Sequence, residues 1–128
     1  MFSVSLLICP KLWPNMPPLG LAYLAAALKK EKVSFHILDL NMQIYNLINE
    51  KELKKKWSLV SKMGEELLFK SYTPFLEELL KSEFFTSSEI IGFSVFETNL
   101  WFSLELAVAI KKKYPQKTLI FGGPEMRF

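Results

Sequence analysis

Small polar side chains that suit ligand binding follow directly after one of the most apolar short stretches of the chain. Residues 90–95 are apolar apart from a serine near their end, which is typical of a strand covered on both faces. Residues 97–99 are Glu-Thr-Asn, and a helical apolar pattern begins at Leu100. In open α/β sheets, ligands bind where buried strands end and turn into helices. The pattern therefore predicts a binding site here and leaves the ligand open.

Catalytic and metal-binding motifs are not found in the sequence. The single cysteine, Cys9, excludes an internal disulfide framework and an iron–sulfur cluster ligated by this chain alone. A lone cysteine at a strand end is more often a small buried residue than a ligand. We interpret His36, the only histidine, as a half-buried structural imidazole. Paired catalytic carboxylates, Ser/His/Asp sets and phosphate loops are also missing, so we expect no catalytic and no metal-ligating residue.

The composition indicates one globular domain. The chain has 128 residues, of which 50% are hydrophobic and 23% charged, enough for a single core. Its formal net charge of +3 comes mostly from lysines expected on helix surfaces, so we expect no nucleic-acid partner. The N-terminus lacks a basic leader, and no apolar run approaches the length of a membrane span. We therefore expect a cytoplasmic protein with no membrane partner.

Strand and helix patterns alternate along most of the chain. Strands are predicted at residues 4–9, 33–40, 90–95 and 117–121, and helices at residues 19–30 and 100–114. The segment 10–18 contains four prolines, which makes it too stiff for a helix or a central strand. It is also longer than a minimal turn between a strand and a helix, and long loops in compact domains tend to be functional.

The connection between the second and third strands is much longer than a plain crossover, which needs about a dozen residues. Its helical pattern is punctuated by Gly64 and Pro74 and predicts an insert of two or three helices at about 42–88. The aromatic residues of the insert either pack internally or close over a ligand. The whole order predicts an α/β fold: a flavodoxin/Rossmann-like parallel sheet of order 2-1-3-4 with helices on both faces. The loops 10–18 and 96–99 then face each other, with 122–125 beside the second.

Four short segments stand at the ends of the predicted strands. They are residues 17–25 (PPLGLAYLA), 38–41 (LDLN), 91–95 (IGFSV) followed by Thr98 and Asn99, and 120–125 (IFGGPE). In this order they resemble the N-terminal cobalamin-binding domain of cobalamin-dependent radical-SAM enzymes of the methyltransferase type. In that family the domain continues with a fifth strand and is followed by a radical-SAM barrel, and neither is present here. The resemblance therefore implies a single, truncated domain over residues 1–128.

The resemblance implies a corrinoid-positioning role. Cobalamin would be held for methyl transfer by a separate barrel, which would carry S-adenosylmethionine and the 4Fe-4S cluster, and this chain alone would not be an enzyme. Without a fifth strand, residues 118–121 form an exposed apolar edge, so we also expect self-association. Two alternatives remain: a flavodoxin-like domain for another nucleotide or flavin, or a non-binding interaction domain.

Strand-end positions and the resemblance together give the candidate cofactor-binding residues. These are Pro10, Leu12, Trp13, Met16, Pro17, Leu19, Gly20, Asp39, Ser94, Val95, Phe96, Glu97, Thr98, Asn99, Gly122, Gly123, Pro124 and Glu125. The histidine motif that ligates cobalt in some cobalamin proteins is absent, so the resemblance implies a lower cobalt face covered by loop residues, with Leu12, Trp13 and Met16 as candidates.

Several of these candidates have a plain structural alternative. Trp13 is either an apolar shelf for a ligand or a core plug. The two glycines at 122 and 123 either let a ligand approach the backbone or form a tight turn. Thr98 or Asn99 is also suited to cap the following helix, and Glu97 is either an acceptor for an amide or a solvated loop carboxylate.

Overall fold

A computed structural model describes residues 3–14, 18–49, 51, 54, 57 and 62–124, the side chains of 62 and 63 excepted. Its first half contains β1 (Ser3–Ile8), α1 (Leu19–Lys30), β2 (Ser34–Asp39), α2 (Leu40–Leu47) and α4 (Lys62–Ser71). Its second half contains α5 (Thr73–Leu80), α6 (Glu83–Thr86), β3 (Ile90–Ser94), the short 3-10 helix η1 (Glu97–Asn99), α7 (Leu100–Lys113) and β4 (Thr118–Gly122).

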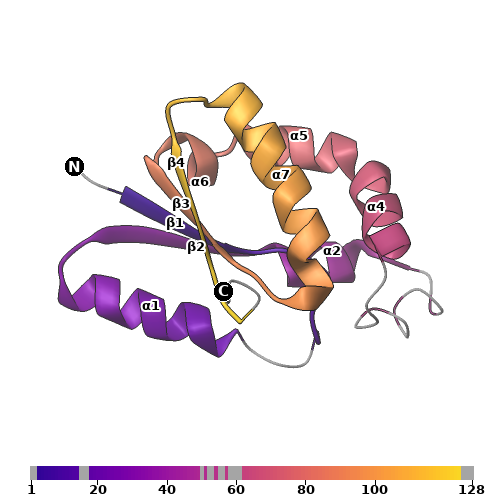
Figure 1. Ribbon diagram of the computed structural model, residues 1–128, viewed down its shortest axis with the longest axis horizontal. Coiled ribbons are helices and arrows are strands. Elements are labelled where there is room, and N and C mark those ends of the chain that lie inside the picture. The colour runs from indigo at the N-terminus through magenta and orange to yellow at the C-terminus, as the bar shows by residue number, and fades with distance from the viewer. Residues whose placement is uncertain are drawn as a thin grey trace.

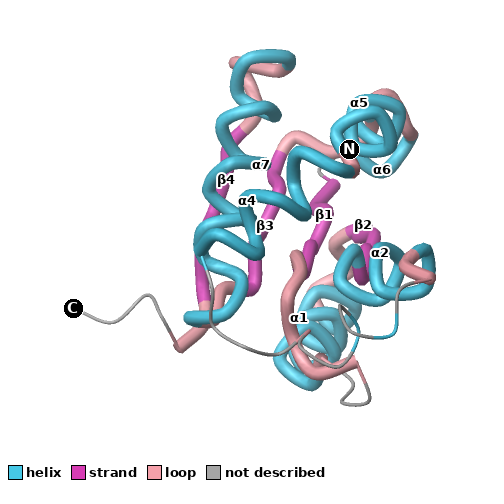
Figure 2. Tube along the Cα trace, turned by 90° about the vertical axis from the view of Figure 1, so that its right-hand side faces the viewer, coloured by secondary structure: helices cyan, strands magenta, loops and turns pink. Residues whose placement is uncertain are grey.

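The four strands form one parallel sheet in the order β2-β1-β3-β4, as Figure 2 shows. Leu7 in β1 is level with Leu38 in β2 and with Phe93 in β3, and Phe93 is level with Phe121 in β4. These partners share one face of the sheet because side chains alternate along a strand. The predicted α/β fold and strand order are confirmed, and the strand order reverses between β1 and β3, so that the topological switch point lies there.

Helices cover the two faces of the sheet unequally (Figure 1). One face carries the main core, in which Leu7 and Phe93 pack with the buried sides of α2, α4, α5, α6 and α7. The other face carries α1, and its buried cluster consists of Leu6, Ile8 and Leu21. The amino-acid pattern explains this difference, since α7 buries five residues and α1 buries Leu21 alone.

The insert is more divided than the sequence predicted. The described part of residues 42–88 includes most of α2 and all of α4, α5 and α6, where two or three helices were expected. Pro74 lies in the first turn of α5, where proline is favoured because that turn needs no internal N–H bond. Trp57 and Phe85 are buried, and Phe69 packs edge-to-face on Phe102 with ring centroids 5.1 Å apart. These aromatic residues pack within the core, which agrees with the expectation of internal packing and not with closure over a ligand.

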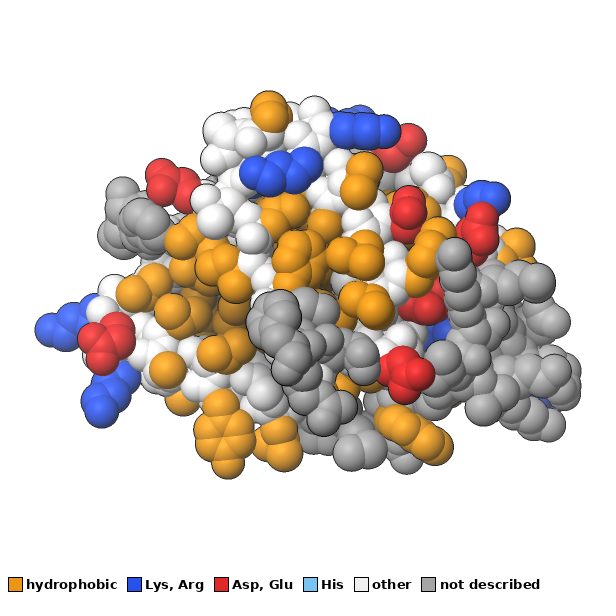
Figure 3. Space-filling view, viewed as in Figure 1, with side chains coloured by type: hydrophobic (Ala, Val, Ile, Leu, Met, Phe, Trp, Pro, Cys, Tyr) orange, Lys and Arg blue, Asp and Glu red, His pale blue; other side chains and the backbone are white. Residues whose placement is uncertain are grey.

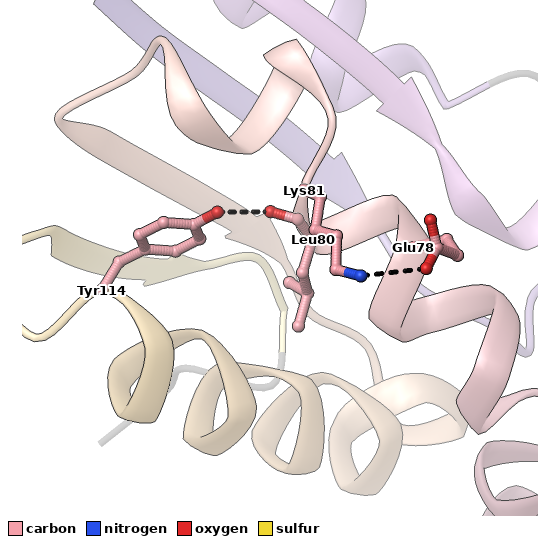
Figure 4. A network of polar contacts seen from close by, with 4 residues as sticks. All are labelled: Glu78, Leu80, Lys81 and Tyr114. Atoms are coloured by element: carbon pink, nitrogen blue, oxygen red, sulfur yellow. Dashed lines mark hydrogen bonds and ion pairs between the residues drawn. The ribbon is translucent and has the colours of Figure 1, made fainter.

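A hydrogen bond fastens the insert to the end of α7 (Figure 4). The Tyr114 hydroxyl donates to the Leu80 carbonyl at 2.6 Å, and Leu80 ends α5. The neighbouring pair Lys81 and Glu78, 3.0 Å apart, is exposed and therefore contributes little to stability. None of the helices in the described ranges is long and apolar enough to cross a membrane.

Candidate functional site

A pocket of roughly 300 Å³ opens at the carboxyl ends of β1, β2 and β3. Its lining comes from the end of β1 and its loop, the start of α1, the end of β2 with the start of α2, and the end of β3. The lining residues are Ile8, Leu12, Trp13, Pro18, Leu19, Gly20, Asp39, Asn41, Ser94 and Phe96. Seven of them were predicted from the sequence, and Ile8, Pro18 and Asn41 were not. The site thus lies at the switch point of the sheet, where open α/β folds bind ligands.

Asn41 holds the loop after β1 in place. Its side-chain oxygen accepts from the Leu12 N–H at 2.9 Å and from the Trp57 indole N–H at 2.8 Å, and its amide donates to the Leu12 carbonyl at 3.2 Å. The residue is only 4% exposed. Its position at the end of the second predicted strand was visible in the sequence, but the direction of its amide was not. Asn41 therefore shapes the pocket wall through Leu12.

Asn99 performs the same task between β1 and β3. Its amide donates to the carbonyls of Cys9 and Ser94, both at 3.1 Å, and its oxygen accepts from the Phe96 N–H at 2.7 Å. The side chain is fully buried and does not cap α7. Asn99 occupies the N-cap position of α7 without a capping hydrogen bond from its side chain, and it is not among the residues that line the pocket. It ties together the two strand ends that flank the pocket.

The polar groups that the pocket offers are few. One oxygen of Asp39 accepts from the Met42 N–H at 2.9 Å and so caps α2, and no other residue in the described ranges bonds to this carboxylate. The Ser94 hydroxyl likewise bonds to no described residue. Most of the remaining lining is aliphatic or aromatic. Such a site suits a largely apolar ligand with a small number of hydrogen-bonding groups.

The rim of the pocket is apolar and open to solvent. Trp13 is 61% exposed and Leu19 is 63% exposed, so Trp13 is not a core plug. A methyl group added at Gly20 would meet no atom within 4 Å, and the same holds at Gly122, which pairs in register with Ser94 of the pocket wall. An apolar shelf and free space beside the backbone therefore adjoin the cavity.

Several predicted residues lie elsewhere. Pro10 and Val95 are buried, and Glu97 is exposed outside the lining. Gly122 and Pro124 are exposed. The lining of the pocket includes none of the residues Thr98, Gly122, Gly123 and Pro124. Met16, Pro17 and Glu125 lie outside the described residues.

Gly123 has a structural reason of its own. Its φ is +115°, and an added Cβ would lie 2.4 Å from the Val95 carbonyl oxygen. This glycine is needed because two backbones approach closely and the conformation is one that other residues rarely adopt. The tight-turn alternative accounts for Gly123 without a ligand.

Two ionisable groups, one in α4 and one in the loop after β1, are buried, and the sequence pattern gave no sign of this. Glu65 of α4 is 3% exposed and Lys11 is 5% exposed. Glu65 accepts from the Phe102 N–H near the start of α7 at 3.3 Å. Burial raises the pKa of Glu65 from 4.5 to about 7, although that hydrogen bond and the charge of Lys11 lower it. Burial also lowers the pKa of Lys11, which the charge of Glu65 partly offsets.

Cys9 is fully buried at the end of β1. Burial raises the pKa of its thiol to about 12, against the lowering effect of a hydrogen bond with Ser103. A fully buried thiol with this pKa is a poor nucleophile near neutral pH. His36 lies in β2 and is partly buried. The structure brings no three residues of the metal-ligating types together in the part of the chain that it describes.

The comparisons found no family model, no curated protein and no solved structure with significant similarity to this chain. The resemblance to cobalamin-binding domains therefore rests on the four segments of the sequence alone, and the fold and pocket stand on the geometry.

Proposed function

We propose that this domain binds a corrinoid of the cobalamin class at the carboxyl edge of its sheet and positions it for methyl transfer by a separate radical-SAM barrel. One observation carries the proposal. The pocket at the switch point is walled by parts of three of the four segments that resemble the cobalamin-binding family: the start of α1, the end of β2 and the end of β3.

The residues around the pocket fit part of such a ligand. A cavity of roughly 300 Å³ is at the small end of ligand pockets and holds an arm or the tail of a corrinoid, not the whole molecule. Ser94 and the Asp39 oxygen that has no partner among the described residues offer hydrogen bonds to amide or hydroxyl groups. Exposed Trp13 and Leu19 supply an apolar surface for the flat ring. When bound, the corrinoid supplies the methyl carrier, and the chain itself contributes binding and orientation.

Retention of hydroxocobalamin after desalting tests the proposal. The wild-type protein is expected to keep corrin absorption bands with the shape of the form that lacks the lower nucleotide ligand. A parallel sample with flavin mononucleotide tests the alternative ligand class. Retained flavin with no retained corrin would contradict the proposal, and so would a folded protein that retains neither.

A matched pair of variants on α1 locates the site. Gly20→Leu places a side chain at the pocket, where an added Cβ meets no atom within 4 Å, and leucine favours a helix more than glycine does. Ala26→Leu adds similar bulk on the same helix at an exposed position outside the lining. Loss of corrin from the first variant alone supports the pocket. Equal retention by both variants would move the ligand elsewhere.

A further inference from the structure

The outer side of β4 carries unpaired backbone groups. Among the strands of the described residues, β4 pairs with β3 alone. The Thr118 N–H and the Gly122 carbonyl bond toward β3, at 2.9 and 2.7 Å. Because successive residues of a strand point their N–H and C=O groups to opposite sides, those of Leu119 and Phe121 point away from the sheet. Such an edge is a template for another strand.

The side chains along this edge are apolar, and α7 borders them with a groove. The groove, of roughly 600 Å³, lies between α7 and β4, and Leu104, Val108, Leu119 and Phe121 are among its lining residues. Leu104 is 46% exposed and Val108 is 51% exposed, and Ile120 on the other face of β4 is 52% exposed. Figure 3 shows hydrophobic side chains gathered on the side of the molecule that carries β4, between α1 and α7. Contiguous apolar surface of this kind marks an interaction site.

We propose that two copies of this chain associate by pairing their β4 strands antiparallel, about a twofold axis at Ile120. In this register Leu119 lies opposite Phe121 of the second copy, and both are residues whose backbone groups point outward. They form the hydrogen-bonded pairs of an antiparallel ladder, and the two Ile120 residues form the non-hydrogen-bonded pair between them. Each position of β4 thus meets a suitable position of an identical strand, as an isologous interface requires.

The helices favour the same arrangement. Since α7 connects β3 to β4 and packs on both, the two α7 helices lie on the same face of the joined sheet. Two strand spacings of about 4.8 Å separate them, or roughly 10 Å, which is the distance at which helices pack. From the α7 end at Lys113, Val108 is about 7.5 Å along the helix, and Ile120 is about 6.6 Å along the strand from Thr118. The twofold axis therefore passes near both Val108 and Ile120.

Charges on α7 are self-complementary about that axis. Glu105 and Lys112 are exposed and lie two turns apart on the same side of the helix, on either side of Val108. When two α7 helices run antiparallel, Glu105 of each copy lies beside Lys112 of the other. Glu105 of the second copy therefore lies beside Lys112 of the first. Leu104 and Val108 of the second copy supply apolar side chains for the groove. These contacts select a second copy over an unrelated strand donor.

Sedimentation velocity of the full chain over about 1 to about 200 μM tests the dimer. A concentration-dependent shift from one copy to two is expected. Glu105→Lys replaces two attractions with two repulsions and is expected to raise the dissociation constant roughly tenfold. The double variant Glu105→Lys with Lys112→Glu restores opposite charges and should bring the constant back near the wild-type value. Glu77→Lys, an exposed change on α5, serves as the control with the same change of net charge.

The double variant distinguishes this specific interface from non-specific association. The three substituted side chains, Glu105, Lys112 and Glu77, are exposed, so a folded far-ultraviolet circular-dichroism signal is expected for each variant. A single copy at every concentration would overturn the proposal. A dimer that Glu105→Lys leaves unchanged, or one that the double variant fails to restore, would also overturn it, because the copies would then meet through another surface.

Discussion

Replacing Glu65 with glutamine should stabilise the protein in mildly basic solution and leave it unchanged in acid. Glu65 is 3% exposed, and burial raises its pKa from 4.5 to about 7. The folded protein therefore binds this proton more tightly than the unfolded chain does. The contribution of the protonated Glu65 to the free energy of unfolding is fully present below about pH 4.5. It decreases as the pH rises to about 7, because folding then requires an ionised carboxylate to be buried.

The size of the effect follows from the two pKa values. The difference between 4.5 and about 7 corresponds to roughly 3 kcal/mol at 1.36 kcal/mol for each pH unit. Glutamine resembles the protonated acid in shape and keeps an oxygen for the Phe102 N–H. At about pH 8 the Glu65→Gln variant should thus be more stable than wild type by up to ~3 kcal/mol, and at about pH 4.5 the two should agree within ~0.5 kcal/mol.

Urea denaturation at several pH values between about 4.5 and 8 measures this difference. The difference between variant and wild type removes the titration of other groups, which both proteins share. Glu66→Gln is the matched control, because Glu66 is the next residue of α4 but is only partly buried and pairs with Lys70 at 3.3 Å. Its effect should stay within ~0.5 kcal/mol. A Glu65→Gln effect that does not change with pH, or that destabilises at about pH 8, would refute the role of burial.

Three further outcomes are expected. Asn41→Ala should destabilise by about 2–4 kcal/mol in chemical denaturation, since it leaves the Leu12 and Trp57 N–H groups without their acceptor, whereas exposed Asn46→Ala on the same helix should have little effect. Tyr114→Phe should cost about 1 kcal/mol because the bond to the Leu80 carbonyl is lost, and Tyr23→Phe, at a side chain that is 75% exposed, should cost nothing measurable. Iodoacetamide should alkylate Cys9, the single cysteine, only after denaturation, since the thiol is fully buried with a pKa of about 12; one adduct forming on the folded protein as fast as on the unfolded chain would disprove this.

The elements that position the pocket were predictable because they depend on local pattern. The apolar run that becomes β3 and the helical spacing from Leu100 both appear in the sequence, and right-handed crossovers then leave few arrangements of four parallel strands. The strand ends at Asp39 and Ser94 were therefore placed at one edge of the sheet, where the pocket opens.

The roles of individual polar side chains were not predictable in the same way. Asn99 follows a strand and precedes a helix, which favours a cap, yet its amide reaches the carbonyls of Cys9 and Ser94 because the end of β1 lies beside it in the fold. Glu65 and Lys11 look like ordinary surface residues in the sequence, and only the fold buries both of them, close enough for the charge of one to affect the pKa of the other. Such choices depend on neighbours that are distant in the chain.

Helix α1 buries little surface against the sheet, so the wall of the pocket that it forms opens more easily than the other walls. This helix buries only Leu21, in a cluster of three residues, and yet its first turn supplies part of the pocket wall. An element with so little buried surface opens locally at a small cost in free energy, so its amide hydrogens exchange with solvent sooner than those of α7. A molecule that occupies the pocket adds contacts to α1. Part of its binding free energy therefore offsets the entropy that α1 loses when it becomes more ordered.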